Sequence, residues 1–279
     1  HREVQHHKAH VASLLAEKGD ISPLIGIAMD GTGYGDDGNI WGGEFFYGDL
    51  NGMERYGHLK YLNLPGGEKA IHEPWRFTLS ILYSTYGDST IVRNYADRYG
   101  PKGQYLLESI RKMGPSVLTS SCGRLFDGIS TLLDLGDINY YDGHLPVLMQ
   151  TAALRAIRQQ SNYSYQIDRS GSDSNGDMAV LNLLPMIDGI RTDRQGTEIK
   201  AYRFHLTLAE AFVEMAEIGR ERYNCSRVGL TGGVFQNTLL LDLTKTGLER
   251  SGFDVLIHSI FPPNDSGISL GQGVLALGG

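Results

Sequence analysis

The stretch RVGLTGGVFQNTLLLDLTKTGLERSGFDVLI, residues 227–257, decides the fold. Its apolar run at Arg227–Leu230 predicts a buried strand, and the glycine pair that follows leads into a helix over Gln236–Glu249. A second short strand is expected at Asp254–Ile257, with a closing helix from Asp265. Strands joined through a helix pair in parallel, so this third of the chain predicts an α/β fold with parallel strands.

The N-terminal region adds a helix and two strands. An apolar stripe at helical spacing predicts a helix over His6–Lys18, with Gly19 as its stop signal. The apolar run Leu24–Met29 fits a buried strand, and the glycine-rich stretch Asp30–Gly38 joins it to a second strand at Ile40–Tyr47. The pattern is a strand, a glycine hairpin and a strand.

The middle of the chain is less regular. Residues 53–120 are mixed and largely helical, which is typical of an insertion into the fold. Helices are expected at 123–135 and 146–159, and a strongly amphipathic helix at 203–223. Residues 161–196 are polar and read as mostly loop.

Composition excludes several classes of protein. The chain has 279 residues, 41% of them hydrophobic, so it is long enough to bury a substantial core. Its net charge of −7, without a basic run, argues against binding to nucleic acid or to an anionic membrane. No apolar run is long enough for a membrane span or a signal peptide, and two cysteines are too few for a disulfide framework. We therefore expect a cytoplasmic protein.

Two sequence patterns near the N-terminus have the chemistry of binding sites. His6 and His10 lie four residues apart on one face of the expected helix, so they can present two imidazoles to one metal ion. Surface histidines or a tag remnant explain that spacing equally well. Asp30, at the end of a strand and before a glycine hairpin, suits metal binding or phosphate binding, and an ordinary tight turn is the alternative.

Two further patterns lie near the C-terminus. Gly232 and Gly233, followed by Asn237, stand at a strand-to-helix junction where a nucleotide can approach the helix N-terminus. A plain turn explains them as well. The Pro-Pro-Asn-Asp-Ser-Gly sequence at 262–267 delivers Asp265 to a helix start, where the carboxylate is either a ligand or a helix cap.

Taken together, these patterns resemble one ordered set. VQHHKAH, DGTGYGDDGNIWGGEF, LPGGEKAIHEPWR, SSCGRLFDG, GLTGGVFQN and FPPNDSGISLGQ follow one another from residue 4 to residue 272. They resemble the signatures of the hydrogenase-maturation carbamoyltransferase family, HypF. The resemblance implies an α/β lobe of the actin/hexokinase/Hsp70-like (ribonuclease H-like) fold, with a mixed sheet, flanking helices and a largely helical insertion near 53–120. It also implies that residues 1–279 are the C-terminal lobe of a longer protein.

The resemblance implies a role for individual residues. A divalent metal, iron or zinc, would be held by His6, His10, Asp30 and Asp265. The implied nucleotide-facing residues are Gly31, Gly33 and Gly35 at the phosphate, Gly123, Asp127, Gly128 and Asp142 at the ribose, and Gly232, Gly233 and Asn237 at the adenosine. Cys122 is expected to pack beside its turn and not to act as a nucleophile.

The sequence departs from the usual family residues at several positions. Lys8 replaces a histidine, His72 an arginine and Ser266 a glycine, while Asp142 and His144 replace longer acidic or amide residues. None of these changes removes an implied metal ligand.

The implied reaction is ATP-dependent carbamoyl transfer. Carbamoyl phosphate and ATP give carbamoyl adenylate, and the carbamoyl group passes to the C-terminal cysteine of a hydrogenase-maturation partner, for the cyanide ligand of nickel–iron hydrogenase. Two alternatives remain: an O-carbamoyltransferase of the same fold, and a non-catalytic module that binds metal and a partner.

Overall fold

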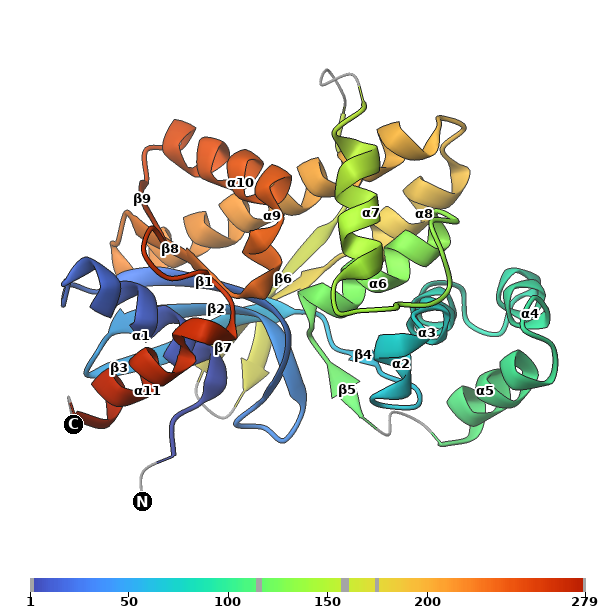
Figure 1. Ribbon diagram of the computed structural model, residues 1–279, viewed down its shortest axis with the longest axis horizontal. Helices are drawn as coiled ribbons and strands as arrows, with labels where there is room; N and C mark the ends of the chain where they lie inside the picture. The colour runs from blue at the N-terminus through green and yellow to red at the C-terminus, as the bar shows by residue number, and fades with distance from the viewer. Residues whose placement is uncertain (1–2, 114–116, 157–160, 174–175, 278–279) are drawn as a thin grey trace.

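The computed structural model describes residues 3–113, 117–156, 161–173 and 176–277. In this part of the chain the strands are β1 (Leu24–Tyr34), β2 (Ile40–Asp49), β3 (Gly52–Leu59), β4 (Leu62–Asn63), β5 (Leu118–Thr119), β6 (Gln166–Asp173), β7 (Gly176–Asn182), β8 (Arg227–Thr231) and β9 (Asp254–Ile257). They form one sheet whose main path runs β6-β7-β3-β2-β1-β8-β9, with β4 and β5 attached beside β2 (Figure 1).

Helices surround this sheet. They are α1 (His6–Lys18), α2 (Lys69–His72), α3 (Trp75–Tyr86), α4 (Thr90–Asp97), α5 (Gly100–Met113), α6 (Cys122–Leu132), α7 (His144–Ala153), α8 (Leu184–Thr192), α9 (Thr197–Tyr223), α10 (Thr238–Arg250) and α11 (Ile268–Leu277). Two short 3-10 helices, η1 (Gly233–Gln236) and η2 (Asp265–Gly267), precede α10 and α11.

The sheet is mixed, and its C-terminal part is parallel. β8 pairs in parallel with both β1 and β9, which confirms the parallel arrangement expected from residues 227–257. β2 pairs antiparallel with β1 and with β3, as expected for consecutive strands joined by short turns. The predicted α/β class with a mixed sheet and flanking helices is confirmed.

Successive residues of β1 point to opposite faces of the sheet, and a helix packs on each face. A side-chain carbon on Gly26 would lie 2.7 Å from Val11 of α1, so this glycine lets the helix approach the strand closely. Ile25, one position earlier, contacts the face of α9 at Gly219. Because successive strand residues point to opposite faces, α1 and α9 cover opposite sides of the sheet. The helices α3 to α5 extend to one side of the molecule (Figure 1).

Helix α1 matches its predicted bounds, since both ends carry strong local signals. The Gln5 side chain accepts hydrogen bonds from the backbone N–H groups of His7 and Lys8 and so caps the start. Gly19 ends the helix in the left-handed conformation, with a φ of 61°.

Two sequence expectations need correction. Residues 161–196 are not mostly loop, because they contain β6, β7 and α8. Strand β6 lies at the sheet edge with many exposed residues, so its sequence lacks the apolar alternation that marks a half-buried strand. Within 53–120, the helical part begins only at Lys69, because Gly52–Leu59 forms β3 of the main sheet.

Other helix boundaries shift by a few residues. The helix expected at 146–159 runs from His144 to Ala153, and residues 157–159 lie outside the described residues. The helix expected at 203–223 begins earlier, at Thr197. Among the described residues, no helix combines the length and apolar character that a membrane crossing requires.

Candidate metal and nucleotide site

The site begins where β1 and β8 stop pairing. Their last parallel pair is Ala28 with Thr231, and β1 continues to Tyr34, past the end expected at Met29. Asp30 of β1 and Gly232 after β8 therefore lie just past the point where these two neighbouring parallel strands separate. In open α/β sheets ligands bind at this edge. Gly232 has a φ of +97°, and a side-chain carbon there would overlap the Met29 backbone, so the turn requires glycine.

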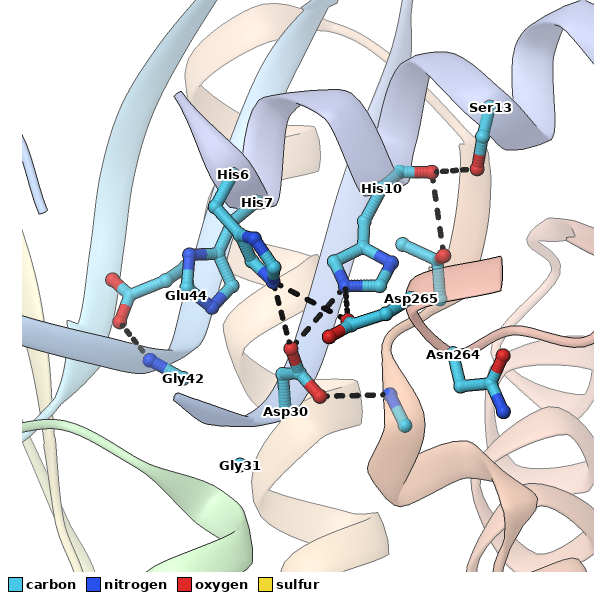
Figure 2. A network of polar contacts seen from close by, with 12 residues as sticks. His6, His7, His10, Ser13, Asp30, Gly31, Gly42, Glu44, Asn264 and Asp265 are labelled. Atoms are coloured by element: carbon cyan, nitrogen blue, oxygen red, sulfur yellow. Dashed lines mark hydrogen bonds and ion pairs between the residues drawn. The ribbon is translucent and has the colours of Figure 1, made fainter. Parts of the chain in front are cut away.

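Four side chains from distant parts of the chain meet at this edge. The Nε2 atoms of His6 and His10 lie 3.1 and 3.2 Å from Asp30 Oδ2. The same two nitrogens lie 3.5 and 3.3 Å from Asp265 Oδ1. Figure 2 shows both imidazoles directed at the two carboxylates, while His7 lies beside Glu44.

Opposite charges dominate this cluster. Burial alone would lower the pKa of His10, but hydrogen bonds to Asp265 and Asp30 raise it to about 9. Burial alone would raise the pKa of Asp30, but hydrogen bonds from His10 and His6 hold it well below its usual range. The two carboxylates thus favour a positive charge between them and the imidazoles, either a proton on an imidazole or a bound cation.

The donor set fits a divalent metal ion. His6, His10, Asp30 and Asp265 each offer one ligand atom, and these atoms all lie within 4.8 Å of one another. Two imidazole nitrogens with two carboxylate oxygens suit iron or zinc. Asp30 is also oriented by its second oxygen, which accepts a hydrogen bond of 3.1 Å from the Gly233 N–H.

Asp265 does not serve as the helix cap that was its alternative role. The Asn264 side chain accepts the hydrogen bond from the Ser266 N–H and caps η2. The Asp265 carboxylate is instead directed at the two imidazoles.

The segment that carries Asp265 is anchored to α1 through Glu17. The fully buried Glu17 carboxylate accepts hydrogen bonds from the backbone N–H groups of Ser259 and Phe261, at 2.7 and 3.2 Å. It also contacts His258 Nδ1 at 2.9 Å. The helix that supplies both histidines therefore also fixes the start of the Asp265 segment.

A cleft of about 680 Å³ opens beside the four ligands. Asp30 and Asp265 of the cluster border it, and so do the predicted nucleotide residues Gly31, Gly123, Asp142, Gly233 and Asn237. A cleft of this size accommodates a nucleotide-sized ligand.

Comparison with known proteins places the chain in one family. The family model described as carbamoyltransferase, Kae1-like domain, second subdomain, matches residues 26–272. The chain is 34% identical to carbamoyltransferase HypF of Synechocystis, covering 96% of this chain and 36% of that protein. It is 30% identical to a carbamoyltransferase HypF homolog of Cupriavidus necator, covering 98% of this chain and 70% of that protein.

The chain belongs to the HypF carbamoyltransferase family. A solved structure of full-length HypF in a phosphate- and nucleotide-bound form superimposes with a TM-score of 0.87 at 32% identity. That match covers 99% of this chain and 36% of the solved one. The chain thus spans little more than a third of such a HypF protein.

Several predicted nucleotide residues of this HypF-family chain lie away from the cleft. A side-chain carbon on Gly33 would lie 2.5 Å from His7, and one on Gly35 would overlap the Trp41 indole. Gly128 faces Phe77 and Ile81 of α3 in the same way. These glycines allow close packing beneath the site.

Asn237 and Gly123 border the cleft, but both also have structural roles. Asn237 caps α10, because its Oδ1 accepts from the Leu240 N–H, and its Nδ2 contacts His205 Nε2 at 2.9 Å. A side-chain carbon on Gly123 would lie 2.8 Å from the Gly31 Cα, so this glycine lets α6 begin against β1. Cys122 is fully buried there, as expected, and burial raises the pKa of its thiol.

Asp127 is fully buried and belongs to a network that the sequence did not reveal. Its Oδ1 accepts a hydrogen bond of 2.9 Å from Asn139 Nδ2, and Arg124 Nη2 lies 3.1 Å from its Oδ2. Burial raises the pKa of Asp127 to about 6 despite the nearby guanidinium. Arg124 stands one helical turn before Asp127. This i, i+3 spacing is the sequence feature that could have predicted their contact. No local pattern marks Asn139.

Proposed function

We propose that this chain performs the transfer half of an ATP-dependent carbamoyl transfer. It would bind carbamoyl adenylate, formed from carbamoyl phosphate and ATP, and pass the carbamoyl group to the C-terminal cysteine of a hydrogenase-maturation partner. The product would serve the cyanide ligand of nickel–iron hydrogenase. The observation that carries the proposal is the four-ligand cluster at the edge of a nucleotide-sized cleft in a HypF-family chain.

The proposed step is an acyl substitution. The cysteine thiolate attacks the carbamoyl carbon, and the bond between that carbon and the phosphate oxygen breaks. The electron pair of that bond leaves on AMP, so the products are a thiocarbamate and AMP. No side chain of this chain needs to act as a nucleophile, which agrees with the complete burial of Cys122.

The residues of the chain contribute binding and orientation. His6, His10, Asp30 and Asp265 would hold the metal. When bound, the metal supplies positive charge that stabilises the departing phosphate. The Gly233 N–H keeps the Asp30 carboxylate oriented, and the cleft holds the anhydride in place for attack.

Calorimetric titration of the metal-loaded chain with AMP and ATP tests the binding step. We expect micromolar binding that disappears when the metal is removed and weakens strongly in Asp265→Ala. Asp254→Ala, which changes an exposed carboxylate on β9, is the matched control and should bind as the unchanged chain does. Equal binding by Asp265→Ala and by the control would contradict the assignment of Asp265.

A second assay tests the acceptor. The chain is mixed with carbamoyl adenylate and a peptide that ends in cysteine, and the products are identified by mass spectrometry. A matched peptide ending in serine reports on O-carbamoyl transfer. Modification of the cysteine peptide alone supports the proposal, transfer to serine favours the O-carbamoyltransferase, and no transfer above the uncatalysed level favours a binding module.

A further inference from the structure

Arg124 is a buried cation beside the proposed nucleotide cleft. It is the third residue of α6, it is 5% exposed, and it borders the cleft. Within the described residues, its Nε and Nη1 atoms are buried and have no hydrogen-bond partner. Each buried donor that stays unpaired costs about 1–3 kcal/mol, so these N–H groups indicate a partner that comes from outside the chain.

The two carboxylates near Arg124 do not accept hydrogen bonds from its Nε or Nη1 atoms. Asp127 Oδ2 lies 3.1 Å from Arg124 Nη2 but has no hydrogen-bond partner in the described structure, so the two groups attract without proper alignment. Asp142 Oδ1 lies 4.0 Å away, and its side chain is 93% exposed, so water screens its charge. Neither carboxylate approaches Nε or Nη1 with a hydrogen bond.

The position of Arg124 relates it to the metal cluster. Its Nη2 lies 3.6 Å from the point where a side-chain carbon on Gly31 would stand, and Gly31 directly follows the ligand Asp30. Ser121 fixes this junction: its Oγ accepts from the Arg124 N–H and donates to the Gly31 carbonyl at 2.5 Å. The guanidinium is thus held at the start of α6, next to the strand that carries a metal ligand.

We propose that Arg124 binds the phosphate of the nucleotide and so selects a phosphorylated ligand over the free nucleoside. A guanidinium presents several N–H donors in a plane that matches phosphate oxygens, and it keeps its charge when buried. Asp127 and Ser121 act as positioning residues for it. This inference rests on the proposed function, because it assumes that the cleft binds a nucleotide.

Calorimetry with two probes, AMP and adenosine, separates phosphate binding from every other contact. The metal-loaded full chain and Arg124→Gln are titrated with both. We expect the variant to bind AMP about 10- to 100-fold more weakly, as for loss of hydrogen bonds to a charged group, with adenosine affinity unchanged. Arg98→Gln, which changes a half-exposed arginine paired with Asp134, is the matched control.

Arg124→Lys covers the case in which the glutamine variant does not fold. Lysine keeps the charge and loses the planar donor set, so we expect a smaller loss of AMP affinity, again with adenosine unchanged. Unchanged AMP affinity in these variants, or equal losses for AMP and adenosine, would overturn the role of Arg124 while leaving nucleotide binding intact. Failure of the unchanged chain to bind either probe would overturn the proposed function, and this inference with it.

Discussion

Asp30 borders the cleft and Asp127 lies buried behind the cleft residues Arg124 and Asn139, and burial acts on both carboxyl groups in the same direction, toward a higher pKa. The pKa of Asp30 nevertheless lies well below its usual range, whereas that of Asp127 rises to about 6. We call these the histidine side (His6, His10, Asp30 and Asp265) and the arginine side (Arg124, Asp127, Asn139 and Asp142).

The difference comes from alignment and not from distance. His6 Nε2 lies 3.1 Å from Asp30 and makes a hydrogen bond to it. Arg124 Nη2 also lies 3.1 Å from Asp127, but the oxygen that it faces has no hydrogen-bond partner. A charge pair in a protein interior offsets the cost of burial only when its geometry is good. On the histidine side the carboxylates therefore pair with the imidazole Nε2 atoms, whereas on the arginine side Asp127 Oδ2 faces a guanidinium without a hydrogen bond in the described structure.

Removing both imidazoles of the histidine side should have the largest effect, because it leaves both sides of the cleft without a paired metal-binding cluster. In the double variant His6→Ala, His10→Ala, the two carboxylates lose both nitrogen ligands, and we expect bound metal to fall from about one ion per chain to background. Elemental analysis after gel filtration measures the stoichiometry. His72→Ala is the control, because that histidine borders the same cleft outside the four-ligand cluster. Full retention of metal by the double variant would move the site elsewhere.

Asp127→Asn should remove a pH dependence of folding stability that comes from the buried carboxyl group of the arginine side. The folded-state pKa of about 6 exceeds the ordinary value of 3.8, so the folded protein binds this proton more tightly than the unfolded chain does. The resulting stability is fully present below about pH 4 and is lost as pH rises through about 6, and it amounts to about 3 kcal/mol. Asparagine resembles the protonated form at every pH.

Urea unfolding of both proteins at pH 4 and pH 7 measures this effect. We expect the stability of Asp127→Asn, relative to the unchanged chain, to increase by about 2 kcal/mol between the two pH values, because the unfolded carboxyl is already partly ionised at pH 4. Other titrating groups contribute equally to both proteins and cancel in the difference. A difference that does not vary with pH would mean that burial does not raise the pKa of Asp127.

The histidine side was more accessible to sequence reasoning than the arginine side. The i, i+4 spacing of His6 and His10 is a local property of one helix, and Asp30 directly follows the apolar run Leu24–Met29. Asp265 lies far along the chain, and only the resemblance to a family connected it to the histidines. All four residues meet in the structure where the pairing of β1 with β8 stops at one edge of the sheet.

The arginine side depends on packing that no local pattern encodes. Gly128 belongs to the same short motif as Gly123, yet it faces α3 while Gly123 faces β1, because they lie on different sides of α6. Asn139 reaches Asp127 through a loop whose path is fixed only by the folded chain. The edge strand β6 was missed for a related reason, since its polar sequence is stabilised by pairing with β7.

Glu17→Gln should have the smallest effect. It tests whether the four side chains of the histidine side hold their positions without the support of a residue outside the cluster. The carboxylate of Glu17 holds the segment before Asp265 through the N–H groups of Ser259 and Phe261. Glutamine keeps the shape but replaces charge-assisted hydrogen bonds with weaker ones. We expect metal affinity to fall about 10-fold, the lower range for partners that orient ligands.

Competition with a chromophoric chelator measures this affinity, and thermal unfolding is followed in the same samples. Glu249→Gln, which changes an exposed residue of α10, is the matched control and should leave metal affinity unchanged. If Glu17→Gln lowers the unfolding temperature but keeps full metal affinity, Glu17 stabilises the fold without orienting Asp265. A selective loss of affinity would instead mean that the histidine side is ordered by its surroundings, and that the carboxylate of Asp265 reaches the imidazoles only while its segment stays anchored to α1.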